Sequence, residues 1–149
     1  DDLALGLLDI ADKIILVATP TLSSIKNTRL VLDVMDALEY PPDKTVFVLN
    51  RVRSERERGR ITAEAIENNL KRKVALQIPA NERATITAIN RGVPLVASDR
   101  AHSPSRELVE LASQLHVALV EEKEEVQAIQ ETVRPSRLGR LFGAGGNGK

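Results

Sequence analysis

The chain has 149 residues, no cysteine and zero formal net charge, with 21 acidic and 21 basic side chains. This composition is that of one soluble domain with a real core, and it excludes disulfides, thiolate zinc sites and a thiol nucleophile. The balanced charge gives no field for nucleic acid, and no apolar run reaches the roughly 20 residues of a spanning helix, so we expect a cytoplasmic protein without nucleic-acid binding.

The first segment, residues 1–10, is predicted to be a short helix. Its apolar residues fall on one broad face: Leu3, Leu7, Leu8 and Ile10. Because the chain starts within this helix and without Met, we expect the amino-terminal part of a longer protein to precede it. The next segment, KIILVA at residues 13–18, is predicted to be a buried strand that ends at Thr19 and Pro20, since proline cannot continue the ladder.

A long helix is predicted next, capped by Ser23 or Ser24 and reaching about Tyr40. Its apolar residues recur at intervals of three and four, which predicts one buried face: Ile25, Leu30, Val31, Val34, Met35 and Leu38. After two prolines, TVFVLNR at residues 45–51 has the apolar run of a strand buried on both faces. Strand, helix and strand together predict a right-handed crossover.

Residues 51–60 are predicted to form a polar loop with five Arg and two Glu. This loop is either a solvated connection or a surface that contacts phosphate or a partner. Thr62 is predicted to cap a short helix, and a third strand follows over residues 74–78. Beyond that strand another helix is expected, opened by Asn81 or Glu82 and ended by a glycine and a proline.

The last long helix is predicted to begin near Ser103 and Ser105. Its leucines give it a face for the sheet: Leu108, Leu111, Leu115 and Leu119. The following EEKEEVQAIQE has five Glu against one Lys, which predicts an acidic helical extension or linker. The predicted divisions are therefore a domain over residues 1–120, the extension over 121–133, and a basic, flexible tail over 134–149.

The alternation of helices and strands predicts an α/β fold, a three-layer, mostly parallel sheet with helices on both faces. The carboxyl ends of parallel strands meet at one edge, so three strand ends are expected to converge: Thr19 with Pro20, Asn50 with Arg51, and Pro79 with Ala80 and Asn81. Such a crevice suits a flat heterocycle such as adenine, which an Asn amide contacts as donor and acceptor. Ordinary turn chemistry at each strand end is the alternative.

The basic tail has a pattern of its own. Arginines recur every three residues and apolar residues share the opposite side: Arg134, Arg137 and Arg140, with Leu138, Leu141 and Phe142. The tail is either a small amphipathic helix on an anionic membrane surface or a disordered basic segment. The first alternative would place the protein peripherally on the inner face of the cell membrane.

Several segments, taken in their order and spacing, resemble a known family. They are ADKIILVATP, SSIKNTRLVLDVMDALEY, VFVLNRV, ALQIPANERATITAINRGVPLV and SPSRELVELASQL. Over residues 1 to about 118 the chain resembles the carboxyl-terminal half of a MinD/ParA-type ATPase, with the CpaE/TadZ-like pilus assembly proteins as the nearest branch. The resemblance implies half of a P-loop NTPase fold, a parent that binds ATP with Mg as a homodimer, and a role in positioning a pilus or secretion apparatus at a membrane site.

The resemblance also implies an adenine pocket and an incomplete catalytic site. In the family the Asn of the LNR strand end and the loop after IP form the pocket, which here gives Asn50, Arg51, Pro79, Ala80 and Asn81. The family's Gly-rich phosphate loop and its Mg-binding and water-orienting aspartates are absent from this sequence, and the terminal GAGGNGK follows no strand. No catalytic residue is therefore assigned, and we expect the chain alone not to hydrolyse ATP; magnesium-dependent turnover by the pure chain would contradict this.

Two other functions remain open at this stage. A ParA-like partitioning ATPase would bind DNA through the arginines of residues 51–60, with steep salt dependence. A nucleotide-free scaffold, or degenerate ATPase, would bind no ATP. The sequence has no metal-ligand spacing, and its two histidines, His102 and His116, have no predictable catalytic partner. Ser103 and Ser105 are explained by helix capping.

Overall fold

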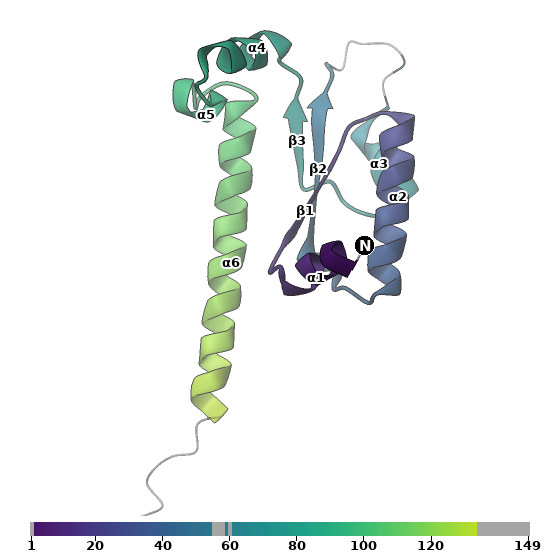
Figure 1. The fold of residues 1–149 in the computed structure, drawn as a ribbon, viewed down its shortest axis with the longest axis vertical. Helices are drawn as coiled ribbons and strands as arrows, with labels where there is room; N and C mark the ends of the chain where they lie inside the picture. Colours follow the sequence, from purple (N-terminus) through teal and green to yellow (C-terminus); the bar gives the residue numbers. More distant parts are fainter. Residues whose placement is uncertain (1, 55–58, 60, 134–149) are drawn as a thin grey trace, which may run out of the picture. The chain divides into compact units, whose positions relative to one another are not determined.

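The computed structural model describes residues 2–54, 59 and 61–133, with residues 121–133 described by their backbone. The middle of the arginine-rich loop and the residues predicted to contact a membrane lie outside the described residues: Arg137, Leu138, Arg140, Leu141 and Phe142. The elements, in chain order, are α1 Asp2–Ile10, β1 Ile14–Ala18, α2 Leu22–Ala37, the 3-10 turn η1 Pro42–Lys44, β2 Thr45–Val52, α3 Ala63–Leu70, β3 Leu76–Pro79, α4 Glu82–Arg91, α5 Leu95–Ser98 and α6 Ser105–Val133 (Figure 1).

The three strands form one parallel sheet in the order β1-β2-β3. Ile14 pairs with Thr45 in the first ladder, and Val48 pairs with Leu76 in the second. Helix α2 connects β1 to β2 and α3 connects β2 to β3, and Figure 1 shows both helices on the same side of the sheet. The predicted α/β class with a parallel sheet is confirmed.

Two apolar clusters, one on each face of the sheet, form the core. The first cluster, under α2 and α3, contains Ala18, Ile25, Leu32, Met35, Phe47, Leu49, Ile66 and Leu70. The second cluster, under the first turns of α6, contains Val48, Leu76, Ile78 and Leu111, with Leu108 and Leu115 packed against it. Successive side chains of a strand point to opposite faces, so Phe47 and Leu49 enter the first cluster and Val48 the second. The prediction of helices on both faces of the sheet is confirmed.

Helix α1 and strand β1 bury less than their sequences predicted. The expected apolar face of α1 is exposed at Leu3, Leu7 and Ile10, because only Leu8 packs against the first cluster. Strand β1 lies at the edge of the three-stranded sheet, where Ile15 and Val17 are exposed. Among the described residues, β1 therefore has an unpaired edge and uncovered apolar surface beside it.

Helix α2 differs from its prediction at its cap and on its buried face. Thr21, not Ser23 or Ser24, is the cap, and its hydroxyl accepts a hydrogen bond from the Ser24 amide. The buried residues are Ile25, Thr28, Leu32 and Met35, whereas Leu30, Val31, Val34 and Leu38 are exposed. The helix carries two apolar stripes, and periodicity alone does not tell which stripe meets the sheet.

The remaining elements follow the predictions closely. Thr62 caps α3, Asn81 caps α4, and Gly92 ends α4 in the left-handed conformation that glycine favours. Helix α5 was not predicted. The chain divides into two compact units, Asp1–Leu115 and His116–Lys149, and α6 is helical through Val133. The predicted divisions after residues 120 and 133 stay predictions.

Candidate functional site

The carboxyl ends of the three strands open into a hollow of about 440 Å3, here called the first hollow. Thr19 and Pro20 contribute from the end of β1, Arg51 from the end of β2, and Ala80 from the residue after β3. The predicted convergence of the three strand ends is thus confirmed for these four residues. The volume of the first hollow is within the range of small-molecule sites in proteins.

The turn that leads from β1 into α2 is fixed by hydrogen bonds at the rim of this hollow. The Thr19 amide donates to the Ser24 hydroxyl at 3.0 Å, and the Thr21 amide donates to the Thr19 carbonyl at 2.7 Å. Ser24 therefore holds the strand end rather than capping the helix. A rim held by local hydrogen bonds is already ordered before any ligand arrives, which lowers the entropy cost of binding.

A second hollow of about 200 Å3 lies at the same strand ends. It is lined by Asn50, Ile78 and Pro79 of the sheet, together with Asn81 and apolar residues from α5 and the start of α6: Leu95, Pro104 and Leu108. Arg51, Ala80 and Glu82 line both hollows. All five residues assigned by resemblance therefore line one hollow or both.

A β-bulge in β2 lies where Asn50 lines the second hollow, Val52 lines the first and Arg51 lines both. Asn50 pairs with Ile78 and Val52 pairs with Pro79, which leaves Arg51 as the extra residue, with φ at +59°. The Asn50 Oδ1 accepts a hydrogen bond from the Arg51 amide at 2.8 Å. A left-handed conformation costs a residue with a Cβ about 1–2 kcal/mol, and this local hydrogen bond offsets part of that cost. Strain of this kind concentrates at functional sites.

Arg51 and Glu82, which both line the two hollows, form an ion pair. The Arg51 guanidinium lies 3.3 Å from the Glu82 carboxylate, and both side chains are largely exposed. An exposed pair of this kind contributes at most about 1 kcal/mol. Arg51 is therefore positioned by Glu82 but remains available to an anionic ligand.

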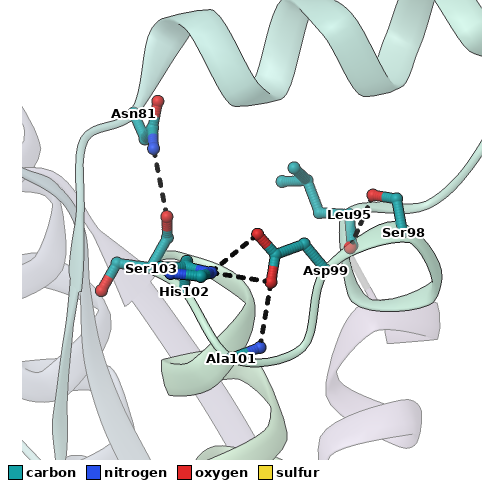
Figure 2. A network of polar contacts seen from close by, with 7 residues as sticks. All are labelled: Asn81, Leu95, Ser98, Asp99, Ala101, His102 and Ser103. Atoms are coloured by element: carbon teal, nitrogen blue, oxygen red, sulfur yellow. Dashed lines mark hydrogen bonds and ion pairs between the residues drawn. The ribbon is translucent and has the colours of Figure 1, made fainter.

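Asn81 uses both ends of its side-chain amide inside the protein. Its Oδ1 accepts from the Ala84 amide at 3.1 Å, and its Nδ2 donates to the Ser103 carbonyl at 3.1 Å. Figure 2 shows the amide at the start of α4 pointing across to Ser103, just ahead of α6. Asn81 thus ties the β3–α4 junction to the entry of the last helix, and it is one of the residues that line the second hollow.

Glu107, which was not among the predicted site residues, is 6% exposed in the first turn of α6. Its Oε1 accepts from the Ser103 hydroxyl at 2.5 Å and from the Arg106 guanidinium at 2.8 Å. Burial alone would raise the pKa of Glu107, but these donors and its own backbone amide hold that pKa below the ordinary value. Within the described residues Oε2 is buried without a partner. A glutamate four residues after Ser103 was the only sequence signal.

The two histidines lie outside both hollows. His102 faces Asp99, with Nδ1 at 2.9 Å from Oδ2, and this hydrogen bond lowers the pKa of Asp99 (Figure 2). His116 is exposed. Across the part of the chain that the structure describes, no three metal-ligating side chains gather, and no helix is long and apolar enough to cross a membrane.

Comparison with known proteins identifies solved structures that share the fold of this chain. No protein-family model and no curated protein matches the chain. Among solved structures, a ParA family ATPase from Chlorobium tepidum is 24% identical with a TM-score of 0.65, and the match covers 75% of this chain and 45% of that protein.

Two MinD structures give similar matches. MinD in the MinC:MinD cell division complex of Aquifex aeolicus is 24% identical, with a TM-score of 0.64 and coverage of 72% of this chain and 44% of that one. MinD with Mg-ADP from Pyrococcus horikoshii is 22% identical, with a TM-score of 0.57 and coverage of 70% and 41%. The chain spans less than half the length of these proteins and shares the fold of that part.

Proposed function

We propose that this chain is the carboxyl-terminal half of a MinD/ParA-type ATP-binding protein and that it supplies the adenine end of the nucleotide site. The observation that carries the proposal is the convergence of three strand ends on two adjoining hollows, in a fold shared with ParA and MinD ATPases. Ligands of open α/β sheets bind at this end of the strands.

The second hollow has the chemistry for an adenine ring. Ile78, Pro79 and Leu108 provide apolar walls for the faces of a flat ring. Because the Asn50 Oδ1 already accepts from the Arg51 amide, its Nδ2 is the group left to donate to a ring nitrogen. About 200 Å3 holds a base but not a whole nucleotide, so the ribose and phosphates would extend into the first hollow beside Arg51.

The phosphate and magnesium chemistry belongs to another part of the parent. Within the described residues no cluster of carboxylates is placed to hold Mg. When bound, Mg would neutralise charge on the phosphates. In this chain Arg51 and Pro79 to Asn81 bind and orient the base and sugar, and catalysis would require a phosphate loop from elsewhere.

The finer role follows the resemblance to CpaE/TadZ-like proteins. The parent would be a homodimer that positions a pilus or secretion apparatus, with the basic tail as a weak membrane anchor. Partner binding has a precedent in the MinC:MinD complex. Co-sedimentation with anionic liposomes, with and without residues 134–149, tests the anchor, and equal binding by the two proteins would refute it.

Adenosine binding by the 149-residue chain tests the adenine pocket. Isothermal titration or ligand-observed NMR should detect adenosine with a Kd of about 0.1–1 mM, and guanosine more weakly. Asn50→Asp keeps an oxygen for the Arg51 amide and removes the Nδ2 donor, so it should weaken adenosine binding about fivefold or more without unfolding the chain.

The matched control for this experiment is Asn27→Asp, because Asn27 is exposed on α2 and lines neither hollow. This variant should bind adenosine like the parent chain. Absence of adenosine binding, or equal binding by Asn50→Asp, would refute the pocket.

A further inference from the structure

A third hollow, of about 380 Å3, lies between α4 and α5, and the nucleotide proposal does not use it. Small side chains of α4, Ala84 and Ala88, form its floor and leave room above the helix. Val93 and Leu95 add apolar surface from the α4–α5 connection. We call this hollow the α4 groove.

One row of α4 places two arginines along the α4 groove. Arg83, Thr87 and Arg91 recur every four residues, which puts them on one side of the helix. The two arginines are eight residues apart, so their Cα atoms are separated by about 12 Å along the axis. One carboxylate or phosphate cannot bridge that distance, and the pair suits a ligand with several anionic groups.

The charge of these arginines is not neutralised locally. Within the described residues neither Arg83 nor Arg91 has an acidic partner. The two nearby acids are engaged elsewhere, because Glu82 pairs with Arg51 and Asp99 pairs with His102. Figure 2 shows the Asp99 carboxylate turned toward the His102 ring and the Ala101 amide.

We infer that the α4 groove binds an acidic, partly apolar peptide segment, and that this segment is residues 121–131 of a second copy of the chain. That run has five Glu against one Lys, together with a valine, an alanine and an isoleucine. Its negative charge complements the unpaired arginines, and its apolar residues match the floor of the groove. The contact does not depend on nucleotide.

A synthetic peptide of residues 118–133, titrated into the full chain, tests the inference by fluorescence anisotropy. The peptide should bind at low salt and weaken as salt rises. The chain variant Arg83→Glu with Arg91→Glu should lose at least about tenfold in affinity. Arg100→Glu, a matched charge reversal at a residue that does not line the groove, should bind like the parent.

A charge swap separates a direct contact from a change in fold. A peptide with its five Glu replaced by Lys should bind the Arg83→Glu, Arg91→Glu variant and not the parent chain. Equal binding of the original peptide by that variant and the parent, or no binding by the parent, would overturn the inference.

The source of the acidic segment is tested with the full chain. A chain with the same five Glu changed to Gln lacks the competing acidic run, so it should bind the peptide at least as tightly as the parent and should self-associate less at low salt. If that variant binds the peptide more tightly but self-associates as the parent does, the run fills the groove of its own chain, which would overturn the assignment to a second copy.

Discussion

The two faces of the sheet are closed to different degrees. On the face under α2 and α3, eight buried residues from strands and helices form one cluster. On the face under α6, four buried residues lie over β2 and β3 alone. On β1, Ile14 and Leu16 pack against the first cluster, while Ile15 and Val17, which alternate to the other face, are 45% and 56% exposed.

This difference shows that the sequence of a strand specifies its apolar character, whereas the neighbouring elements determine which of its two sides is buried. IILVA has the same apolar character on both sides, but within the described part of the chain a helix packs on only one side of it. Soluble proteins usually protect such an edge with charges or cover it. The open face of β1 is therefore the natural place for further polypeptide, in agreement with the proposal that the chain is half of a larger ATPase.

The largest expected effect compares the same substitution on the two faces. Leu49→Ala removes a side chain that is 1% exposed in the larger cluster, and we expect a loss of about 4 kcal/mol in the free energy of unfolding. Leu111→Ala, in the smaller cluster, should cost about 2.5 kcal/mol, because the site can relax more easily. Urea unfolding measures both, and a larger loss for Leu111→Ala would contradict the comparison.

The second prediction concerns the open face itself. Ile15→Lys with Val17→Lys should lower the association constant for self-association about tenfold, because the introduced charges repel copies that pair through β1. The free energy of unfolding should change by less than about 0.5 kcal/mol, because both side chains are exposed.

The control for this prediction is Ile86→Lys with Ile89→Lys, which changes exposed isoleucines on α4 and should leave self-association as it is. Sedimentation velocity at high salt separates this apolar contact from the charged contact of the α4 groove. A parent chain that is monomeric throughout would refute the idea that β1 associates.

Much of the fold was predictable because local signals agree with the tertiary structure. Prolines, caps and the apolar runs of Thr45–Val52 and Ala63–Leu70 mark element boundaries within a few residues. The choice between the two apolar stripes of α2 was not predictable, because Leu30 and Leu32 have the same chemistry and only packing distinguishes them.

The candidate site was predictable at the level of strand ends but not of side chains. Three strand ends converge because parallel strands share an edge, a rule that needs no side-chain detail. The bulge at Arg51 depends on pairing between Asn50 and Ile78, 28 residues apart, which no local pattern encodes. The buried Glu107 depends on α6 packing and was missed for the same reason.

A third and smaller effect concerns the hydrogen bond from the Asn81 side chain to the Ser103 carbonyl, which joins the β3–α4 junction to the start of α6. Asn81→Ala removes both the cap on the Ala84 amide and the bond to the Ser103 carbonyl, and we expect a loss of about 1–2 kcal/mol. Asn81→Asp keeps the cap and loses only the second bond, so it should cost about half as much. Urea unfolding compares the two variants, and an unchanged stability of Asn81→Asp would mean that the bond to Ser103 contributes nothing.

The smallest expected effect concerns the exposed pair of Asp99 and His102, which precedes α6. The hydrogen bond from His102 lowers the pKa of Asp99, so the folded state holds this carboxylate in its charged form more strongly than the unfolded chain does. The contact therefore stabilises the fold above the ordinary pKa of an aspartate, and its contribution is lost as the pH falls through the lowered pKa. His102→Ala should raise the pKa of Asp99 toward its ordinary value, which an NMR titration of the carboxyl carbon measures. An unchanged pKa in that variant would mean that the Ala101 amide, not His102, holds the carboxylate.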